Sequence, residues 1–372
     1  MQIHIIQTRS ELNTLEPEWQ QLLAESTVNS LFMTWEWVSA WLDSATPMTV
    51  NELFVITIRD GQGKLRAIAP FYKTRFRLLK LIPLTVLRIL GDEGTGGEYP
   101  AMIIDREHQS TVLACLIETL RTNQKHWHLI WLARMSGWDG FSDALAAQLA
   151  QSGLACRQRP RSFSYFPLPS DFTDFEQNLS SNRRQQFRRQ AKKIHASGDI
   201  EITACRSESE LPADLQILFD LHGARRELLG DAGTFKRKPQ QVDFYRLFTR
   251  LALTNNWLWL YALRQNGQVR AIQLGYVRNG VFYQIQEGFD PDFLPGAGNV
   301  LRMEVIKQCI KNGVTEFDFL GEHTEHKRRW SAVERTGRDM LIGNSSVWAK
   351  IVLHKPLWPT GRFLQPVLRT SK

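Results

Sequence analysis

The 372-residue sequence has few cysteines and lacks long hydrophobic runs. Its four cysteines, Cys115, Cys156, Cys205 and Cys309, lie far apart and form no C-x-x-C pair. This argues against a zinc site or a disulfide framework and suits a reducing compartment. No window approaches ~18 uninterrupted apolar residues, so no transmembrane helix is expected. The N-terminal stretch lacks a basic start followed by an apolar core, so we expect no signal peptide and a cytoplasmic location.

Low-complexity segments are also missing, and 43% hydrophobic with 23% charged residues is the composition of a folded protein. The length predicts two domains of ordinary size. The net charge of +8 is unevenly spread, because residues 1–175 have 16 basic and 18 acidic residues and residues 176–372 have 30 and 20. The difference of −2 against +10 predicts an anionic partner for the second half.

The first half mixes the two types of periodicity. Short alternating runs predict strands at 53–58, 66–72 and 84–90, and a buried strand at 127–135. Helical spacing predicts helices at 32–45, 111–123 and 139–153, the last closed by Gly153. The Gly-rich segment 91–100 carries three acidic residues and predicts a flexible loop. Pro and Ser cluster over 160–172 and predict a domain boundary there.

The second half begins with a helical stretch over 171–198 and a short strand at 199–205. Helical segments follow at 208–229 and 239–254, and further strands are expected at 314–320 and 338–346. Between them lie three successive strands at 257–265, 268–278 and 280–289. The Asn-Gly pairs 266–267 and 279–280 join these strands, and Asn-Gly is the strongest short-range hairpin signal.

A Gly-containing turn, LPGAGNVLRMEV (294–305), follows the third strand and begins a helix with an apolar face at Leu301, Val305 and Cys309. A helix N-terminus presents unpaired N–H groups and a partial positive charge, and glycine lets a ligand approach the backbone. The arrangement suits a pyrophosphate. The alternative is an ordinary turn, because the sequence is neither G-x-G-x-x-G nor a Walker loop.

The order strand, strand, strand, Gly-containing loop, helix, strand resembles the core of the GNAT superfamily of acyl-CoA N-acyltransferases. Three stretches, 179–194, 295–322 and 326–330, look more narrowly like the CelD/BcsL-type branch, which is associated with cellulose biosynthesis. This branch is a distant cousin of the Fem-type aminoacyltransferases. The resemblance implies an α/β (α+β) fold of two tandem GNAT-like units, each a mixed, mostly antiparallel sheet flanked by helices. Residues 1–168 would form a degenerate unit, and residues 169–372 the acyl-CoA-binding unit.

The resemblance also implies a co-substrate, acetyl-CoA or another acyl-CoA, and no metal. The pyrophosphate would bind to the backbone N–H groups of Gly296, Ala297, Gly298, Asn299 and Val300. An amine acceptor would attack the thioester directly, without a covalent intermediate.

Three side chains are candidates for the chemistry. Glu287 ends an apolar strand and could act as the base, or it is a solvated strand-end residue. Asp318 lies between two phenylalanines and could orient the acceptor or act as the base, or it ties its strand to a neighbour such as Arg302. Tyr283 could protonate the leaving thiolate, or it is a core tyrosine.

The segment 321–330 concentrates acids, histidines and bases. His323 and His326 are three residues apart, but this is not H-E-x-x-H and no third ligand is evident, so we expect no metal. In the look-alike family this stretch often carries Tyr-Lys, where this chain has His326-Lys327. Lys327 is therefore a candidate contact for CoA phosphates rather than part of a Tyr-Lys pair.

Three segments have unbalanced positive charge. The helical stretch 182–193 has six positive and no negative residues, and 183–193 is a candidate surface for CoA phosphates, RNA, an anionic polysaccharide or a lipid, or else a solvated face. Segments 73–90 and 348–372 mix bases with Leu, Ile and Trp and could touch a membrane peripherally, at the inner membrane. The alternative for 73–90 is a strand pair with a basic linker, and the alternative for 348–372 is a packed terminal helix and tail.

We therefore expect an acyltransferase that moves an acyl group, in the simplest case acetyl, to a small-molecule or glycan-precursor amine, with an amino sugar of surface polysaccharide biosynthesis favoured by resemblance. No DNA partner is expected. Two alternatives stay open: Fem-like aminoacyl transfer from charged tRNA, and a non-catalytic accessory protein of a polysaccharide synthase.

Overall fold

The computed structural model describes the chain except for residues 45–51, 228–229, 231–232, 356, 360–362 and 368–372. The chain divides into two compact units. Unit 1 comprises Met1–Arg161 and Thr336–Lys372, and unit 2 comprises Ser162–Arg335. This differs from the expected division at residue 168, because the C-terminal segment returns to the first unit.

Unit 1 is a mixed sheet with helices. Its elements are β1 (Gln2–Ile6), α1 (Arg9–Asn13), α2 (Glu16–Glu25), a 3₁₀ turn (Leu31–Met33), α3 (Trp35–Asp43), β2 (Glu52–Arg59), β3 (Leu65–Leu78), β4 (Ile82–Ile89), β5 (Ile103–Ile104), α4 (Gln109–Thr122), β6 (Leu129–Met135), α5 (Phe141–Ser152), the start of β7 (Ala155–Pro167), most of β13 (Val333–Gly343), α13 (Val347–His354) and β14 (Leu364–Pro366). The strand order is β1-β2-β3-β4-β6-β13. All these pairs are antiparallel except β4 with β6, which is parallel.

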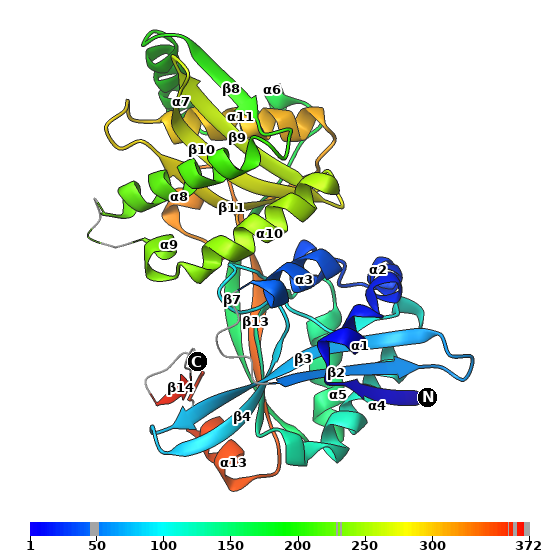
Figure 1. The fold of residues 1–372 in the computed structure, drawn as a ribbon. Helices are drawn as coiled ribbons and strands as arrows, with labels where there is room; N and C mark the ends of the chain where they lie inside the picture. Colours follow the sequence, from blue (N-terminus) through cyan, green and yellow to red (C-terminus); the bar gives the residue numbers. More distant parts are fainter. Residues whose placement is uncertain (45–51, 228–229, 231–232, 356, 360–362, 368–372) are drawn as a thin grey trace. The chain divides into compact units, whose positions relative to one another are not determined.

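Unit 2 has the same kind of sheet (Figure 1). Its elements are the end of β7, α6 (Phe172–Asn178), α7 (Ser181–His195), β8 (Ile200–Ala204), α8 (Leu211–Glu227), α9 (Thr234–Arg237), α10 (Gln240–Thr254), β9 (Leu258–Gln265), β10 (Gln268–Arg278), β11 (Val281–Phe289), α11 (Ala297–Lys311), β12 (Glu316–Asp318), α12 (Glu325–Arg328) and the start of β13. The order is β7-β12-β11-β10-β9-β8, with only β11 and β12 parallel. Helices α8 and α10 lie on one face of this sheet, and α7 and α11 lie on the other (Figure 1).

The two units repeat one connection. In unit 1 the meander β2-β3-β4 leads through α4 to β6, which pairs in parallel with β4. In unit 2 the meander β9-β10-β11 leads through α11 to β12, which pairs in parallel with β11. A helical crossover is what a parallel pair requires. The expected fold class, two tandem units with mixed sheets flanked by helices, is confirmed.

Local sequence explains most element ends in unit 2. Asn266-Gly267 and Asn279-Gly280 all have positive φ, the geometry of the tight turns that Asn-Gly favours. The stretch expected to be one helix over 171–198 is two, because Leu179 is extended and Ser180 caps α7 by accepting a hydrogen bond from Arg183 N at 3.4 Å. The Pro- and Ser-rich segment near residue 160 belongs mostly to β7 rather than to a loop.

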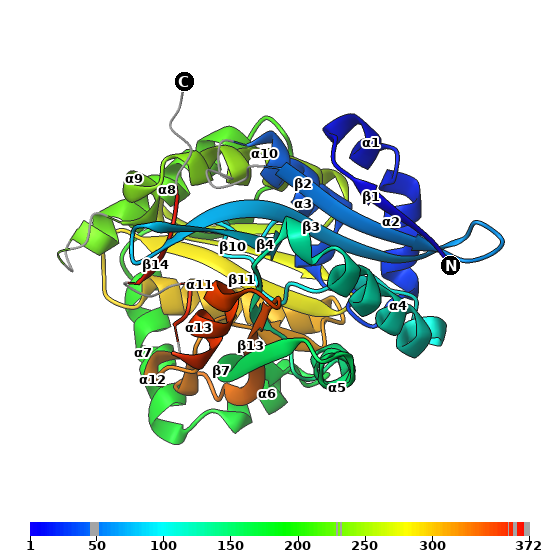
Figure 2. The same cartoon turned by 90° about the horizontal axis from the view of Figure 1, so that it is seen from below.

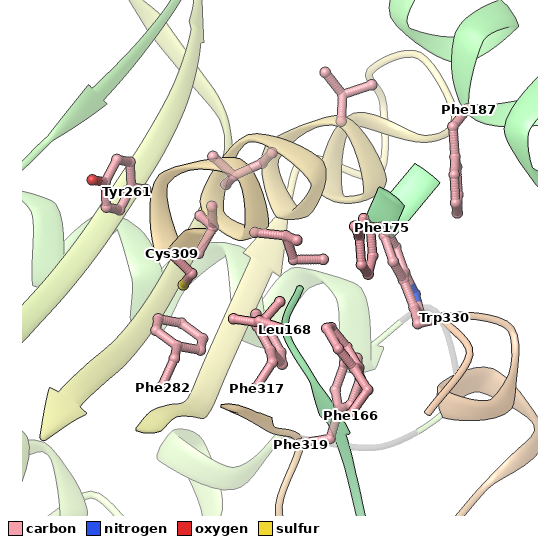
Figure 3. Packing of buried hydrophobic residues seen from close by; sticks show 14 of the residues in the cluster. Phe166, Leu168, Phe175, Phe187, Tyr261, Phe282, Cys309, Phe317, Phe319 and Trp330 are labelled. Carbon is pink, nitrogen blue, oxygen red and sulfur yellow. The ribbon is translucent and has the colours of Figure 1, made fainter. Parts of the chain in front are cut away.

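The core of unit 2 forms between α11 and the sheet (Figure 3). Leu301, Val305 and Cys309 are buried, as the helical spacing predicted. Phe187 of α7 stacks on Trp330 with ring centroids 4.6 Å apart, which ties α7 to the segment after α12. Phe166 stacks on Phe317 at 5.0 Å and joins β7 to β12.

The Gly-rich loop 91–100 of unit 1 is packed, which makes the expectation of a flexible loop wrong. Thr95, Glu98 and Tyr99 are buried. The indole N–H groups of Trp37 and Trp41 donate to the carbonyls of Gly91 and Glu93 at 3.2 and 2.9 Å. The loop fills the place after β4 that corresponds to the Gly-containing turn after β11. None of the helices in the described ranges is long and apolar enough to cross a membrane.

Gly275 allows β10 and β11 to approach each other closely. An added Cβ would lie 2.2 Å from Phe282 Cζ and 2.9 Å from Tyr283 O. We predict that Gly275→Ala lowers the free energy of unfolding by about 1–3 kcal/mol, because the ring or the strand must shift. Urea denaturation measures this as a lower midpoint at unchanged slope. The control is Gly61→Ala, whose Cβ meets nothing within 4 Å. Equal midpoints for the two variants would contradict the prediction.

Candidate functional site

The Gly-containing turn begins helix α11. Gly296 is the N-cap residue, has φ +103°, and leaves α11 without a side-chain cap. A Cβ at Gly296 would lie 2.4 Å from Gln190 Cδ, so glycine is required both by the left-handed backbone and by the approach of α7. The first-turn N–H groups have no partner inside the helix. By contrast, Thr34, Ser180 and Ser346 cap α3, α7 and α13 with their hydroxyls.

A cavity of about 360 Å³ lies against this turn. The turn and the start of α11 form one side of it, the segment after β11 forms another, and two cationic or titratable groups of α11 and α12 complete it. Its lining residues are Glu287, Phe289, Asp290, Pro291, Phe293, Leu294, Pro295, Gly296, Ala297, Gly298, Asn299, Arg302 and His326. The cavity thus combines uncapped N–H groups, aromatic and proline walls, and a small set of polar groups, which is the usual make-up of a ligand site.

Glu287 forms an ion pair with Arg302 in the wall of this cavity. Gln284 Nε2 also donates to the Glu287 carboxylate at 3.3 Å. Arg302 is only 2% exposed. The sequence suggested Asp318 as the partner of Arg302, and the structure pairs Arg302 with Glu287 instead. A buried arginine needs such a partner, because an unpaired buried charge is very costly.

Aromatic rings and a histidine hold the Arg302 guanidinium in place. Its Cζ lies 4.8 Å from the Trp330 ring centroid and 5.7 Å from that of Phe319. Nη1 lies 3.4 Å from Nε2 of His326. Nε has no hydrogen-bond partner among the described residues. The guanidinium is therefore fixed in orientation by its contacts with Glu287, His326 and the two rings.

The geometry of β11 places Glu287 at the cavity. β11 pairs with β12 only over Val281–Tyr283. The pairing with β10 then shifts by one residue between Leu274 and Gly275, which leaves Ile285 as a bulge. The end of β11 therefore separates from β12. This separation places Glu287 at the cavity wall.

Asp318 and Tyr283 do not line the cavity. Asp318 is fully buried, pairs with Arg335 at 2.5 Å and accepts a hydrogen bond from Leu320 N at 2.8 Å. Tyr283 lies opposite Asp318 in the parallel register. Burial, with Asp318 close by, raises the pKa of the Tyr283 hydroxyl well above its usual value. A hydroxyl with such a raised pKa is a weak proton donor.

Of the residues predicted to bind CoA, four line the cavity and two do not. Gly296, Ala297, Gly298 and Asn299 line the cavity, whereas Val300 lines a separate apolar groove between α7 and α11. Lys327 Nζ donates to the Leu320 carbonyl, so it supports the β12–α12 loop rather than lining the cavity. The residue that lines it from α12 is His326.

Near this site, the described histidines bind other protein groups. Nδ1 of His323 forms a hydrogen bond with Ser164 Oγ at 3.0 Å, and His326 contacts Arg302. Among the described residues one group, Asp105, Glu107 and His108 in unit 1, has metal-like spacing. Asp105 forms an ion pair with Arg66 and accepts from Glu107 N at 2.9 Å, so it acts as the cap before α4.

Gln190 and Arg302 are site residues that sequence reasoning missed. Gln190 Oε1 accepts a hydrogen bond from Asn299 Nδ2 at 3.1 Å and lies over Gly296. The basic stretch 182–193 therefore contacts the turn through the neutral Gln190. Arg188, Arg189, Lys192 and Lys193 are exposed instead. A sequence signal existed for Arg302, which is a lone charge on the apolar face of a buried helix.

Comparison with known protein families gives the class of this domain. Residues 181–328 match the family model described as "Acetyltransferase (GNAT) domain". This range includes α7, the β9-β10-β11 meander, the Gly-containing turn and α12. Unit 2 therefore carries a GNAT acetyltransferase domain, and the protein is an acyltransferase by class. Comparison with curated protein sequences gave no match.

Solved structures resemble the whole chain rather than the domain alone. FemX aligns with a TM-score of 0.66 at 11% identity, over 95% of this chain and 100% of its own. The C-terminal domain of a putative lysylphosphatidylglycerol synthetase from Agrobacterium fabrum aligns at 0.53 and 12%, over 92% and 96%. L-PGS from Bacillus licheniformis aligns at 0.52 and 12%, over 92% and 96%. At these identities the similarity establishes a shared two-unit fold.

The Asp318–Arg335 pair gives a stability prediction. We predict that Asp318→Asn lowers the free energy of unfolding by about 3 kcal/mol, at the lower end for a broken buried pair because Glu316 still contacts Arg335 at 2.7 Å. The matched control Glu316→Gln should cost about 1 kcal/mol, since its side chain is 23% exposed. Urea denaturation measures both. Asp318→Asn with wild-type stability would favour a catalytic over a structural Asp318.

Proposed function

We propose that the protein transfers an acyl group, acetyl in the simplest case, from an acyl-CoA to an amine. The observation that carries this proposal is the uncapped N-terminus of α11, with Gly296 and Gly298, opening into the cavity that holds Glu287 and Arg302. In a GNAT domain this is the place for the donor. The first-turn N–H groups would bind the pyrophosphate, and the apolar wall would bind the pantetheine arm.

Glu287 is the base in this proposal. It is a carboxylate at the splayed end of β11 that lines the cavity, and Arg302 and Gln284 hold it in one orientation. It would accept the proton from the acceptor amine, directly or through a water, as the amine nitrogen attacks the thioester carbonyl. The C–S bond then breaks and the CoA thiolate leaves. The thiolate then takes up a proton from solvent.

The acceptor class follows from the resemblance alone. The stretches at 179–194 and 295–322 look like the CelD/BcsL-type branch, which favours an amino sugar or another glycan-precursor amine as acceptor. This chain has His326-Lys327 where that branch often has Tyr-Lys. His326 lines the cavity, and Lys327 donates to the Leu320 carbonyl.

Aminoacyl transfer from charged tRNA is the second candidate, and two observations favour it. The fold aligns with FemX over nearly the whole chain. Helix α7 also places four exposed bases next to the residue that covers the Gly-containing turn. A polyanion could follow this face into the donor cavity, and its binding would weaken steeply with salt.

Donor binding separates the two candidates. We predict that acetyl-CoA at ~100 times its dissociation constant stabilises the protein by about 2.7 kcal/mol, measured as a thermal shift. Gly298→Leu should abolish the shift, because the side chain would project into the cavity. An added Cβ there meets only Phe289 Cδ1 at 3.6 Å, so the helix itself should tolerate leucine.

Gly61→Leu in an open turn of unit 1 is the matched control and should keep the shift. A wild-type protein that no CoA ester stabilises, but that binds charged tRNA in a salt-sensitive way, would replace acyl-CoA by tRNA as the donor. A protein that binds neither donor would favour the accessory role.

The base assignment is tested by Glu287→Gln. With a panel of amino sugars and other amines as acceptors, thiol release from acetyl-CoA should fall by about 10²–10⁴-fold while acetyl-CoA binding persists. Glu304→Gln is the control. Glu304 accepts from Gln308 on the same helix and lies outside the cavity. Glu287→Gln with full turnover and an intact donor thermal shift would remove Glu287 from the chemistry.

A further inference from the structure

The tip of the β3–β4 hairpin in unit 1 exposes leucines where a turn usually has polar residues. Leu79 and Leu81 are 55% and 81% exposed. Leu81 N donates to Leu78 O at 3.1 Å, and the two central residues, Leu79 and Lys80, have φ of +54° and +64°. Asn-Gly is preferred at such positions because side chains with a Cβ are strained there. A leucine at this tip therefore contributes neither burial nor a relaxed turn to the fold.

The C-terminal segment, remote in sequence, lies beside this tip. β14 pairs with the end of β3, with Leu364 opposite Leu78, and Leu79 N donates to Phe363 O at 2.8 Å. Helix α13 packs on the same core cluster through Ala349 and Val352. Figures 1 and 2 both show β14 and α13 next to the β3–β4 hairpin. The two segments that the sequence singled out as basic and apolar therefore form one surface.

We define this surface as the hairpin surface, and its exposed apolar members come from the hairpin tip, from α13 and from the residue before β14. They are Leu79, Leu81, Val347, Trp348 and Phe363. They account for five of the ten large hydrophobic side chains that are exposed among the described residues. Isolated exposed apolar side chains need no explanation, but a concentration of half of them on one surface indicates a partner.

The charge around these side chains has one sign. Arg75, Arg77, Lys80, Lys350 and Lys355 are exposed, and none forms an ion pair with a described residue. Segments 73–90 and 340–372 contain no Asp or Glu. Along β3 the bases Arg75 and Arg77 alternate with the buried Phe76 and Leu78, and at the tip the apolar side chains project outward.

From this combination we infer that the hairpin surface docks onto an anionic lipid bilayer. The leucines, Val347 and Trp348 would insert at the level of the headgroups, and the bases would pair with the lipid phosphates. A nucleic acid would bind the basic side chains but would offer no apolar environment for the exposed leucines. A bilayer with anionic headgroups accommodates both kinds of side chain. The inference is independent of the chemistry in the donor cavity, which belongs to unit 2.

Vesicle flotation of the full chain tests this inference. The wild type should float with vesicles of phosphatidylcholine mixed with phosphatidylglycerol and not with phosphatidylcholine alone, and high salt should weaken binding. Leu79→Glu with Leu81→Glu should reduce the partition coefficient by about tenfold or more. Arg77→Glu with Lys80→Glu, which keeps both leucines, should give a similar loss.

Three control variants test whether vesicle binding depends on the hairpin surface. Ile3→Glu changes an apolar side chain of unit 1 that is 47% exposed elsewhere, and Lys125→Glu reverses an exposed charge outside the surface. Both should bind as the wild type does. Arg188→Glu with Arg189→Glu tests α7. The inference fails if the wild type binds no anionic vesicle at low salt, if the leucine variant binds undiminished, or if only the α7 variant loses binding.

Discussion

The ion pair between Glu287 and Arg302 is the interaction on which the site of unit 2 depends. It joins the end of β11 to the first turns of α11, and these are the two elements that the Gly-containing turn connects. Arg302 is buried between Trp330 and Phe319, so the pair also fixes the helix against the segment that follows β12. A buried pair is seldom a net gain in stability over apolar packing. Beside an uncapped helix N-terminus, the pair therefore contributes the position of Glu287 more than stability.

Unit 1 contains the same connection without a comparable ion pair between β4 and α4 among the described residues. β4, α4 and β6 repeat the path of β11, α11 and β12. Before its helical crossover, Asp105 caps the 3₁₀ turn Arg106–His108 and pairs with Arg66. The loop after β4 is filled by its own buried residues and held by two indoles. Neither α4 nor α11 has a side-chain cap, so the two connections differ in what lies before the helix: a packed loop in unit 1 and a cavity in unit 2.

The meander and the helix after it could be predicted from sequence for local reasons. Asn-Gly pairs fix a hairpin turn within four residues, and the spacing of Leu301, Val305 and Cys309 fixes the buried face of α11. The partners of buried charges could not be predicted in this way. Asp318 was matched with Arg302, yet Arg335 from β13 pairs with it, 17 residues further along the chain. Which of several arginines reaches a carboxylate is decided by tertiary packing, and spacing contains no such information.

The predictions for residues 182–193 and 91–100 were incomplete or wrong for a related reason. Composition predicts a charged surface for the first, which is correct for Arg188, Arg189, Lys192 and Lys193, but the contact with the Gly-containing turn is made by Gln190. Composition predicts a mobile loop for the second, and the rings of Trp37 and Trp41, over 50 positions away, hold it in place. The charge count by halves also misses a local feature.

The first half has a net negative charge, yet all the charged residues of its segment 73–90 are basic. The structure adds that the C-terminal strand β14 pairs with β3 in this segment.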